Sequence, residues 1–193
     1  MPEHAFLSYI KKYITISSDE WELVSSKLVK ATYQEGDILL AEGKVCKHLH
    51  FLESGLMRYY IIKDGEELNK FFTEPPYLFT SQQSFGLGIP ALETIVALQD
   101  SVVWSLTKRD VDELSERSFW RTFAEKVKLE VQGLTEIILE QIQGMTAEER
   151  YIWMLANEQS LIRELPLKHL ASYLGIAPQS LSRIRKKVAE NRS

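Results

Sequence analysis

The stretch from Leu165 to Lys187, LPLKHLASYLGIAPQSLSRIRKK, constrains the fold of this chain more than any other part. Its first half repeats apolar residues at helical spacing up to Gly175, which tolerates the positive φ that ends a helix before a sharp turn. Pro178 suits the first turn of a second helix, because an N–H group at that position has no intrahelical partner. The stretch therefore predicts two short helices joined by a tight turn, with apolar stripes formed by Leu167, Leu170, Ala171 and Leu174 and by Leu181, Ile184 and Val188.

The second predicted helix, residues 178–187, carries amide, hydroxyl and guanidinium groups outside its apolar stripe. These groups match the donor and acceptor patterns of base edges in the major groove, and Lys side chains suit phosphates. The pattern therefore predicts a helix-turn-helix that binds double-stranded DNA; a helical hairpin with a solvated basic face is the alternative. The predicted DNA-binding residues are Lys168, Pro178, Gln179, Ser180, Ser182, Arg183, Arg185 and Lys186. Among them we expect base-edge contacts from Gln179, Ser182 and Arg183, and phosphate contacts from Lys168, Ser180, Arg185 and Lys186.

Charge is distributed unevenly along the chain. The formal net charge of −4 does not by itself favour a nucleic-acid partner. Residues 166–193, however, contain six Lys or Arg and a single acid, Glu190, a balance of +5 that leaves −9 for the rest of the chain. A basic tail on an acidic body places positive charge where the predicted reading helix lies.

The chain before this tail changes its hydrophobic period. Residues 1–32 show helical spacing, and Ser17-Ser18-Asp19 can cap a helix that runs to Leu28. Residues 33–106 fall into short β-rich runs separated by glycines, and Asp64-Gly65 is typical of a two-residue hairpin turn. Six such runs at this spacing predict a β-sandwich or jelly roll, and residues 107–116 return to helix.

The longest predicted helix runs from Ser118 to Met145, and its apolar residues recur at alternating spacings of four and three. This heptad pattern is typical of a helix that buries one seam, either on the β domain or against a second copy. We favour a homodimer, because a roll of this size leaves part of so long a helix uncovered. Thr146 and Glu149 then match a capping box, which predicts a new helix and a domain boundary at residues 144–146. The predicted dimer seam consists of Trp120, Ala124, Val127, Val131, Leu134, Ile138, Gln141 and Met145.

The order of glycine-spaced β-roll, long helix and C-terminal helix pair resembles the cyclic-AMP receptor/FNR-type (Crp/Fnr) family of bacterial transcription regulators over nearly the whole chain. The matching residues are Gly36, Gly43 and Gly55 at turns of the roll and the tail LASYLGIAPQSLSRIRKK. The resemblance implies an α+β fold with a cyclic-nucleotide-binding-like domain at residues 1–117, a dimerisation helix at 118–145 and a helix-turn-helix domain at 146–193. It also implies a homodimer that reads a near-palindromic site, with RNA polymerase as a further candidate partner.

The ligand pocket that the resemblance implies departs from the family pattern. Members that bind cyclic nucleotides carry a Gly-Glu pair, whose Glu holds the ribose, and a later Arg-Ser/Thr-Ala, whose Arg neutralises the phosphate. The corresponding stretch here, residues 75–98, lacks the Gly-Glu pair and places Ala91, Leu92 and Glu93 at the positions of the later motif. Residues 71–107, which include this stretch, contain no Lys or Arg. We therefore expect no binding of cyclic AMP by the usual mode. An unknown small-molecule effector would meet Tyr77, Phe79, Ser81, Gln82, Gln83, Phe85 and Glu93, unless the aromatic side chains among them fill the pocket as core.

The second departure lies at the end of the chain. Family members follow the reading helix with a β-hairpin wing, whereas residues 188–193 are too few for a hairpin. We therefore expect a helix-turn-helix domain that lacks a full wing and depends on the run Arg185-Lys186-Lys187 for phosphate contacts.

No cofactor and no metal site are predicted. The single cysteine, Cys46, cannot hold an iron–sulfur cluster. A haem group remains an alternative, because the chain contains four histidines. His48 and His50, however, alternate along one predicted strand, a pattern typical of a solvated face.

The remaining patterns narrow the functional class. The sequence contains no membrane-length apolar run and no signal-peptide pattern, so we expect a cytoplasmic protein without a membrane partner. It contains no HExxH, P-loop or nucleophile–base arrangement, so we expect no enzyme. The alternative to a DNA-binding regulator is a ligand-sensing or protein-interaction module of the same fold that no longer binds DNA.

Overall fold

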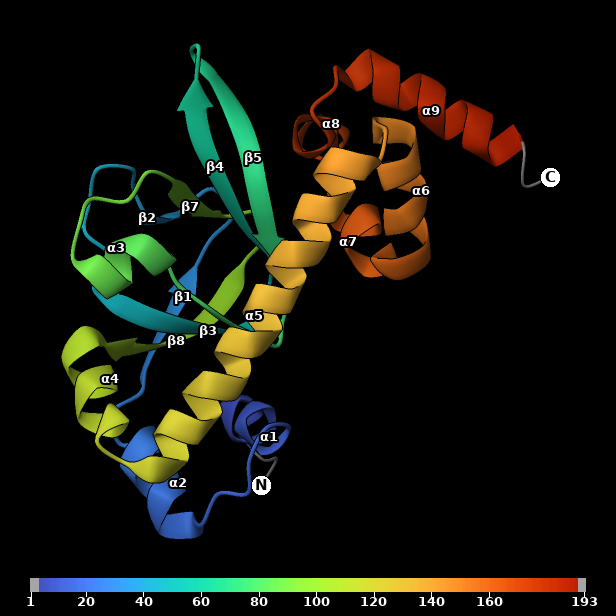
Figure 1. The fold of residues 1–193 in the computed structure, drawn as a ribbon. Helices are drawn as coiled ribbons and strands as arrows, with labels where there is room; N and C mark the ends of the chain where they lie inside the picture. The colour runs from blue at the N-terminus through green and yellow to red at the C-terminus, as the bar shows by residue number, and fades with distance from the viewer. Residues whose placement is uncertain (1–3, 191–193) are drawn as a thin grey trace. The chain divides into compact units, whose positions relative to one another are not determined.

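The structure is a computed structural model that describes residues 4–190, and it forms two compact units (Figure 1). The first unit contains Met1–Ile61 and Phe72–Val131, and the second contains Ile62–Phe71 and Gln132–Ser193. The predicted boundaries after residues 117 and 145 coincide with the starts of helices, whereas the two units divide inside the long helix. Within the described residues no helix combines the length and the apolar composition that crossing a membrane requires.

The first unit is built on a β-sandwich of two four-stranded sheets (Figure 1). One sheet has the order β1-β8-β3-β6 and the other β2-β7-β4-β5, and every pairing whose register is resolved is antiparallel. The predicted α+β fold with an N-terminal β-sandwich is therefore confirmed. The strands are β1 (Val29–Tyr33), β2 (Ile38–Leu40), β3 (His48–Ser54), β4 (Met57–Lys63), β5 (Glu66–Thr73), β6 (Tyr77–Phe79), β7 (Thr94–Ala97) and β8 (Ser101–Thr107).

Two turns explain why the strands begin where they do. Asp64 and Gly65 have φ angles of 54° and 82°, so the predicted hairpin turn between β4 and β5 is confirmed. Gly55 has a φ of 97°, and a Cβ atom built on it would lie 2.1 Å from Ser101 Oγ. Only glycine fits this turn between β3 and β4. The prediction that strands begin near residue 33 was wrong by four residues, because β1 already starts at Val29 and pairs with β8.

Helices close one end of the sandwich and bury an aromatic core (Figure 1). They are α1 (Ala5–Lys11), α2 (Ser18–Ser25) and α4 (Lys108–Ser115), while the short α3 (Gln82–Leu87) follows β6. The predicted cap at Ser17 is present as a capping box with Glu20. The buried core residues are Phe6, Tyr9, Ile10, Val24, Phe51, Leu106, Leu114, Trp120 and Phe123.

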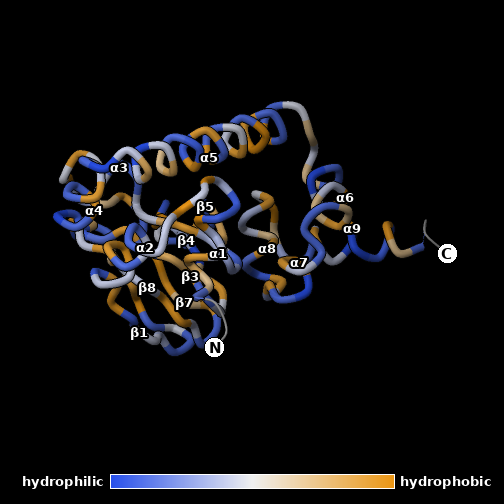
Figure 2. Tube along the Cα trace, turned by 90° about the horizontal axis from the view of Figure 1, so that it is seen from below, coloured by the Kyte–Doolittle hydropathy of each residue, from blue (hydrophilic) through white to orange (hydrophobic). Residues whose placement is uncertain are grey.

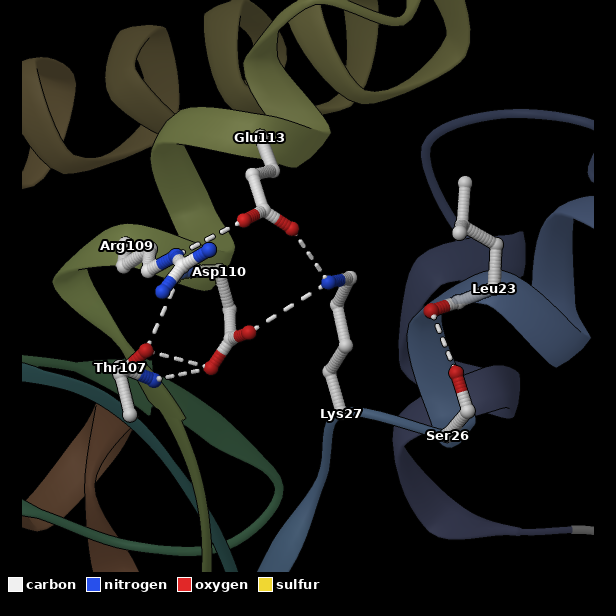
Figure 3. A network of polar contacts seen from close by, with 7 residues as sticks. All are labelled: Leu23, Ser26, Lys27, Thr107, Arg109, Asp110 and Glu113. Atoms are coloured by element: carbon white, nitrogen blue, oxygen red, sulfur yellow. Dashed lines mark hydrogen bonds and ion pairs between the residues drawn. The ribbon is translucent and has the colours of Figure 1, made fainter.

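A polar network fastens α4 to the segment that leads from α2 into β1 (Figure 3). Lys27 Nζ donates to Glu113 Oε2 at 2.7 Å and contacts Asp110 Oδ1 at 3.4 Å. Arg109 Nε donates to the other oxygen of Glu113 at 3.0 Å, and Asp110 also caps α4 through Thr107. The hydrogen bond from Lys27, and secondarily the one from Arg109, lower the pKa of Glu113. This carboxylate therefore stays charged at lower pH than a free glutamate does.

The long helix α5 (Ser118–Gly144) starts inside this core. Trp120 is only 2% exposed and packs on Phe123 with ring centroids 5.3 Å apart. Its assignment to a dimer seam was therefore wrong, because its side chain belongs to the core of its own chain. Val127 packs against the same core, so the first half of the predicted seam covers the sandwich domain. Apolar and polar segments alternate along α5 (Figure 2), and the exposed apolar residues from its second half onward are Leu134, Ile137, Leu139, Ile142 and Met145.

The second unit contains four further helices, α6 (Ala147–Asn157), α7 (Gln159–Glu164), α8 (Leu167–Leu174) and α9 (Pro178–Glu190). The predicted capping box is present, because Glu149 N donates to Thr146 Oγ1 at 3.2 Å and Thr146 N donates to Glu149 Oε2 at 2.7 Å. The apolar stripes predicted in the tail meet in the core of this unit, which contains Tyr151, Met154, Leu161, Leu165, Leu170, Ala171, Leu174, Leu181 and Val188.

Candidate nucleic-acid interface

The two helices predicted from the tail are present as α8 and α9. Gly175 ends α8 in the left-handed conformation with a φ of 73°, and its N–H donates to Ser172 O at 3.0 Å. Ile176 N then donates to Ala171 O at 3.0 Å, which completes the tight exit from the helix. Pro178 is the first residue of α9, as expected for a position that needs no N–H donor.

The polar residues of α9 gather on the face that points away from the core. Leu181 is fully buried and Val188 is 7% exposed, so these two side chains anchor the helix. At 100° per residue, Gln179, Ser182 and Arg183 lie on the opposite arc, and all three are exposed. The other predicted contact residues are also accessible: Lys168, Pro178, Arg185 and Lys186 are exposed and Ser180 is half-buried. One helix therefore presents an amide, a hydroxyl and a guanidinium group together.

Ion pairs and helix ends fix the orientation of this polar face. Arg150 of α6 donates to Tyr173 O at 3.0 Å and to Leu174 O at 3.5 Å, which satisfies carbonyls at the end of α8. Its guanidinium also lies 5.7 Å from the centroid of the Tyr173 ring. Lys187 Nζ pairs with Glu148 at 2.7 Å, so this lysine joins α9 to α6. Of the basic run expected to contact phosphates, Lys187 is thus already engaged within the unit.

Strand β5 of the β4–β5 hairpin docks on α8. Asn69 N donates to Ser172 Oγ at 3.1 Å, and Ser172 Oγ donates to Glu67 O at 3.0 Å. Asn69 Nδ2 donates to His169 O at 2.9 Å and lies 3.4 Å from His169 Nδ1. Asn69 and His169 are 5% and 8% exposed, so these contacts are buried. The helix that precedes α9 is therefore held from two sides, by Arg150 and by the hairpin.

The residues predicted to line an effector pocket do not all converge. Phe79 is buried, stacks on His50 at 5.2 Å and meets the edge of Tyr59 at 6.4 Å, so it fills core. Ser81 Oγ donates to Glu93 Oε1 at 2.7 Å. Tyr77 and Phe85 are half-buried, and burial raises the pKa of Tyr77 to about 12. Gln82 and Gln83 are exposed on α3.

The two histidines of β3 correct another expectation. Their rings lie on one side of the strand, 5.7 Å apart, but His50 is only 5% exposed and Nδ1 lies 2.8 Å from Ser105 Oγ. Burial, and secondarily the nearby His48, lower the pKa of His50 to about 3. The solvated face predicted for this pair was wrong for His50, which is a neutral core residue. Among the described residues, His, Cys, Asp and Glu side chains nowhere gather in a group of three that could hold a metal ion.

Several residues that shape the candidate sites gave no recognisable signal in the sequence. Asn69 and Ser172 are separated by 103 positions, so no local pattern connects them. Arg150 lies in a helix that the sequence predicts, but no pattern indicated that its side chain contacts the end of α8. Lys108, just beyond the cation-free stretch, reaches over the ring of Phe85 with Nζ 5.6 Å from the centroid.

The segment that contains the β-sandwich is similar to a known protein family. Residues 30–118 match the model of the cyclic nucleotide-binding domain. No curated protein matches the chain in sequence. In the matched segment Ala91 is 3% exposed, and its backbone groups pair with Gly43 N and Lys44 O, both at 2.8 Å. A short apolar side chain therefore stands where the family resemblance implies an arginine.

Solved structures extend the likeness to nearly the whole chain. A mutant of CooA from Carboxydothermus hydrogenoformans is 16% identical with a TM-score of 0.72, covering 98% of this chain and 86% of that one. A putative transcriptional regulator of the Crp/Fnr family from Eubacterium rectale is 16% identical with a TM-score of 0.68, covering 93% and 88%. Catabolite activator protein from Thermus thermophilus is 19% identical with a TM-score of 0.58, covering 93% and 86%. The chain therefore has the fold of Crp/Fnr-type transcription regulators.

Proposed function

We propose that this protein is a DNA-binding transcription regulator of the Crp/Fnr type and that α9 enters the major groove. The observation that carries the proposal is the exposed arc of Gln179, Ser182 and Arg183 opposite the buried Leu181 and Val188. Amide and guanidinium groups on a rigid helix suit base-edge recognition, and the neighbouring Arg185 and Lys186 suit phosphates. The balance of +5 over residues 166–193 supports the same face.

Arg183 is the best test of this role, because a guanidinium can donate two parallel hydrogen bonds to guanine. After selection of a preferred site from random DNA, Arg183→Ala should weaken specific binding by about 1–3 kcal/mol and relax the preference at one position. Arg183→Lys keeps the charge but loses the fork geometry, so it should recover affinity for non-specific DNA and not the base preference.

Arg163→Ala is the matched control, because Arg163 is exposed on α7 and its removal changes the net charge equally. A gel-shift titration in which Arg183→Ala and Arg163→Ala bind the preferred site equally well would refute the reading role of Arg183. If random DNA yields no enriched site and a protein partner is captured reproducibly, the interaction-module alternative replaces the proposal.

We infer further that the protein acts as a homodimer through the second half of α5. Leu134 and Met145, both predicted seam residues, are each 38% exposed, and Ile137 and Ile142 beside the seam are 44% and 57% exposed. A single chain leaves these apolar side chains in water, and pairing with a second copy would bury them. Two reading helices would then enter successive major grooves about 34 Å apart on a near-palindromic site.

The dimer is tested by sedimentation of Leu134→Glu. A carboxylate at the seam meets its own copy in a two-fold dimer, so we expect a monomer and loss of binding to a two-half-site DNA. Leu129→Glu is the control, because Leu129 is 68% exposed and lies on the opposite side of α5. A Leu134→Glu protein that remains dimeric, or a Leu129→Glu protein that dissociates equally, contradicts the assignment of the seam.

We also infer that cyclic AMP does not act on this protein by the usual mode. Ala91 offers no cation to a phosphate, and the carboxylate of Glu93, held by Ser81, would repel one. Calorimetric titration of the wild-type protein with cyclic AMP should give no binding, while the double variant Ala91→Arg/Glu93→Ala should gain it. Micromolar binding by the wild-type protein would contradict this inference, and the effector would then be the cyclic nucleotide itself.

A further inference from the structure

A basic cavity lies in the first unit, away from the β-sheets. It is a shallow depression, wide open to solvent, with a volume of about 570 Å³, and it lies between the end of α1 with the loop that follows it and the first turns of α5. Three exposed lysines line it, Lys11, Lys12 and Lys126, and none of the described residues in its wall is acidic. This volume is within the range of sites for small organic ligands. The cavity is therefore a concave surface of one charge sign.

Contacts within the unit hold the lysines around the cavity. Lys11 is the last residue of α1 and Lys12 is its C-cap, so both lysines lie at the C-terminal end of this helix, beside the cavity. Lys126 Nζ donates to Tyr13 O at 2.7 Å, which ties α5 to the loop. Lys12 Nζ lies 5.5 Å from the centroid of the Tyr9 ring. Two segments that are far apart in sequence thus bring positive charge to one place.

The remaining wall combines apolar surface with hydrogen-bond donors. Tyr13, Ile14 and Phe119 line the cavity and pack from behind against the buried core. Phe119 is the second residue of α5, whose first turn contains no acidic residue, so the positive end of this helix lies beside the lysines. The carboxylate of Glu130 accepts from the Tyr13 hydroxyl at 2.5 Å and does not line the cavity.

We propose that this cavity binds a small organic phosphate. The three ammonium groups neutralise the phosphate, as Lys commonly does, and the N-terminus of α5 adds donors. The organic part of the ligand lies on the wall of Tyr13, Ile14 and Phe119. The site is distinct from the cyclic nucleotide-binding domain at residues 30–118, because every lining residue except Ser118 lies outside that range. It is also independent of the proposed DNA binding.

The probes are phenyl phosphate, inorganic phosphate and benzyl alcohol, titrated calorimetrically into the full chain at low salt. We expect phenyl phosphate to bind with one site, inorganic phosphate to bind more weakly, and benzyl alcohol not to bind. Lys12→Gln should weaken phenyl phosphate about two- to fivefold, which is the range for one exposed charge pair. The triple variant Lys11→Gln/Lys12→Gln/Lys126→Gln should weaken it about tenfold or more, and added salt should weaken the wild type.

The matched control is Lys44→Gln/Lys47→Gln/Lys63→Gln, which removes the same charge from exposed positions outside the cavity. It should bind phenyl phosphate as the wild type does. If the triple variant loses its circular dichroism signal, Lys12→Gln alone carries the test, because Lys12 is exposed and its ammonium lies over the Tyr9 ring. Equal binding by wild type and Lys12→Gln, equal weakening by the control, or no binding of phenyl phosphate each overturns the proposal. Loss of DNA affinity in the cavity variants without phenyl phosphate binding would assign these lysines to the DNA backbone instead.

Discussion

Replacement of Ser172 by Ala tests how firmly strand β5 holds the first helix of the candidate DNA-binding motif. The Ser172 hydroxyl accepts from Asn69 N at 3.1 Å and donates to Glu67 O at 3.0 Å, so one side chain joins two backbone groups of β5 to α8. Ser172→Ala removes both contacts and leaves the apolar packing of α8 unchanged. The side-chain contacts from Asn69 to His169 remain in place.

The magnitude follows from the two lost contacts. Each net hydrogen bond contributes about 1 kcal/mol, so their loss costs about 2 kcal/mol. Alanine is the better helix former by about 0.5 kcal/mol, which offsets part of the loss. We therefore expect Ser172→Ala to lower the free energy of opening this contact by about 1.5 kcal/mol, and hydrogen exchange of the Asn69 amide to become about tenfold faster.

Amide exchange followed by NMR measures this contact directly, because the Asn69 N–H is itself one of the donors. Ser182→Ala is the control, since the Ser182 hydroxyl donates to Pro178 O within α9 itself, at 3.1 Å. That variant should leave exchange at Asn69 unchanged. Unaltered protection of the Asn69 amide in Ser172→Ala would refute the argument that the hydroxyl fastens the hairpin to α8.

Three further predictions concern the core, a turn and the support of α8. The pKa of His50 is lowered to about 3 in the folded protein, against about 6.5 in the unfolded chain. The contribution of His50 to the free energy of unfolding should therefore be fully present above pH 6.5 and decrease as the pH falls toward 3, by at most about 1.4 kcal/mol per pH unit. Urea unfolding across this range should show the slope in wild type and in His48→Asn, and lose it in His50→Asn. Gly55→Ala should destabilise the fold by more than about 2 kcal/mol, because its Cβ would meet Ser101 Oγ at 2.1 Å, whereas Gly36→Ala, with φ of 91° and open space, should cost only about 1 kcal/mol by the same unfolding assay. Arg150→Ala should lower the midpoint of thermal unfolding of the second unit by removing about 1–2 kcal/mol of hydrogen bonding and ring contact, and Arg150→Lys should lower it less; equal midpoints for wild type and Arg150→Ala would contradict the support role.

Local signals in the sequence were sufficient for much of the fold. The capping box at Thr146 and Glu149, the turn at Asp64-Gly65 and the helix stop at Gly175 were each predicted from a few adjacent residues, and each is present. Their physics is local, because a cap or a turn is satisfied by its own neighbours. His50 shows the limit: alternation along β3 places it on one face, but its burial depends on residues such as Phe79 of β6 and Ser105 of β8, which come from elsewhere in the chain.

The heptad pattern of α5 shows why the candidate dimer seam was only partly predictable. A spacing of four and three specifies which face of a helix is buried, and it contains no information about what buries that face. At Trp120 the sandwich domain of the same chain supplies the cover, whereas at Leu134 the single chain leaves 38% of the residue exposed. The cover of this stripe therefore differs along the helix: Leu134 is partly exposed, whereas Gln141, further along the same predicted seam, is only 8% exposed within its own chain. Length favours such a difference, because 27 residues span about 40 Å, more than one end of a small β-sandwich can cover. The exposed remainder of the same stripe is the part on which the proposed homodimer depends.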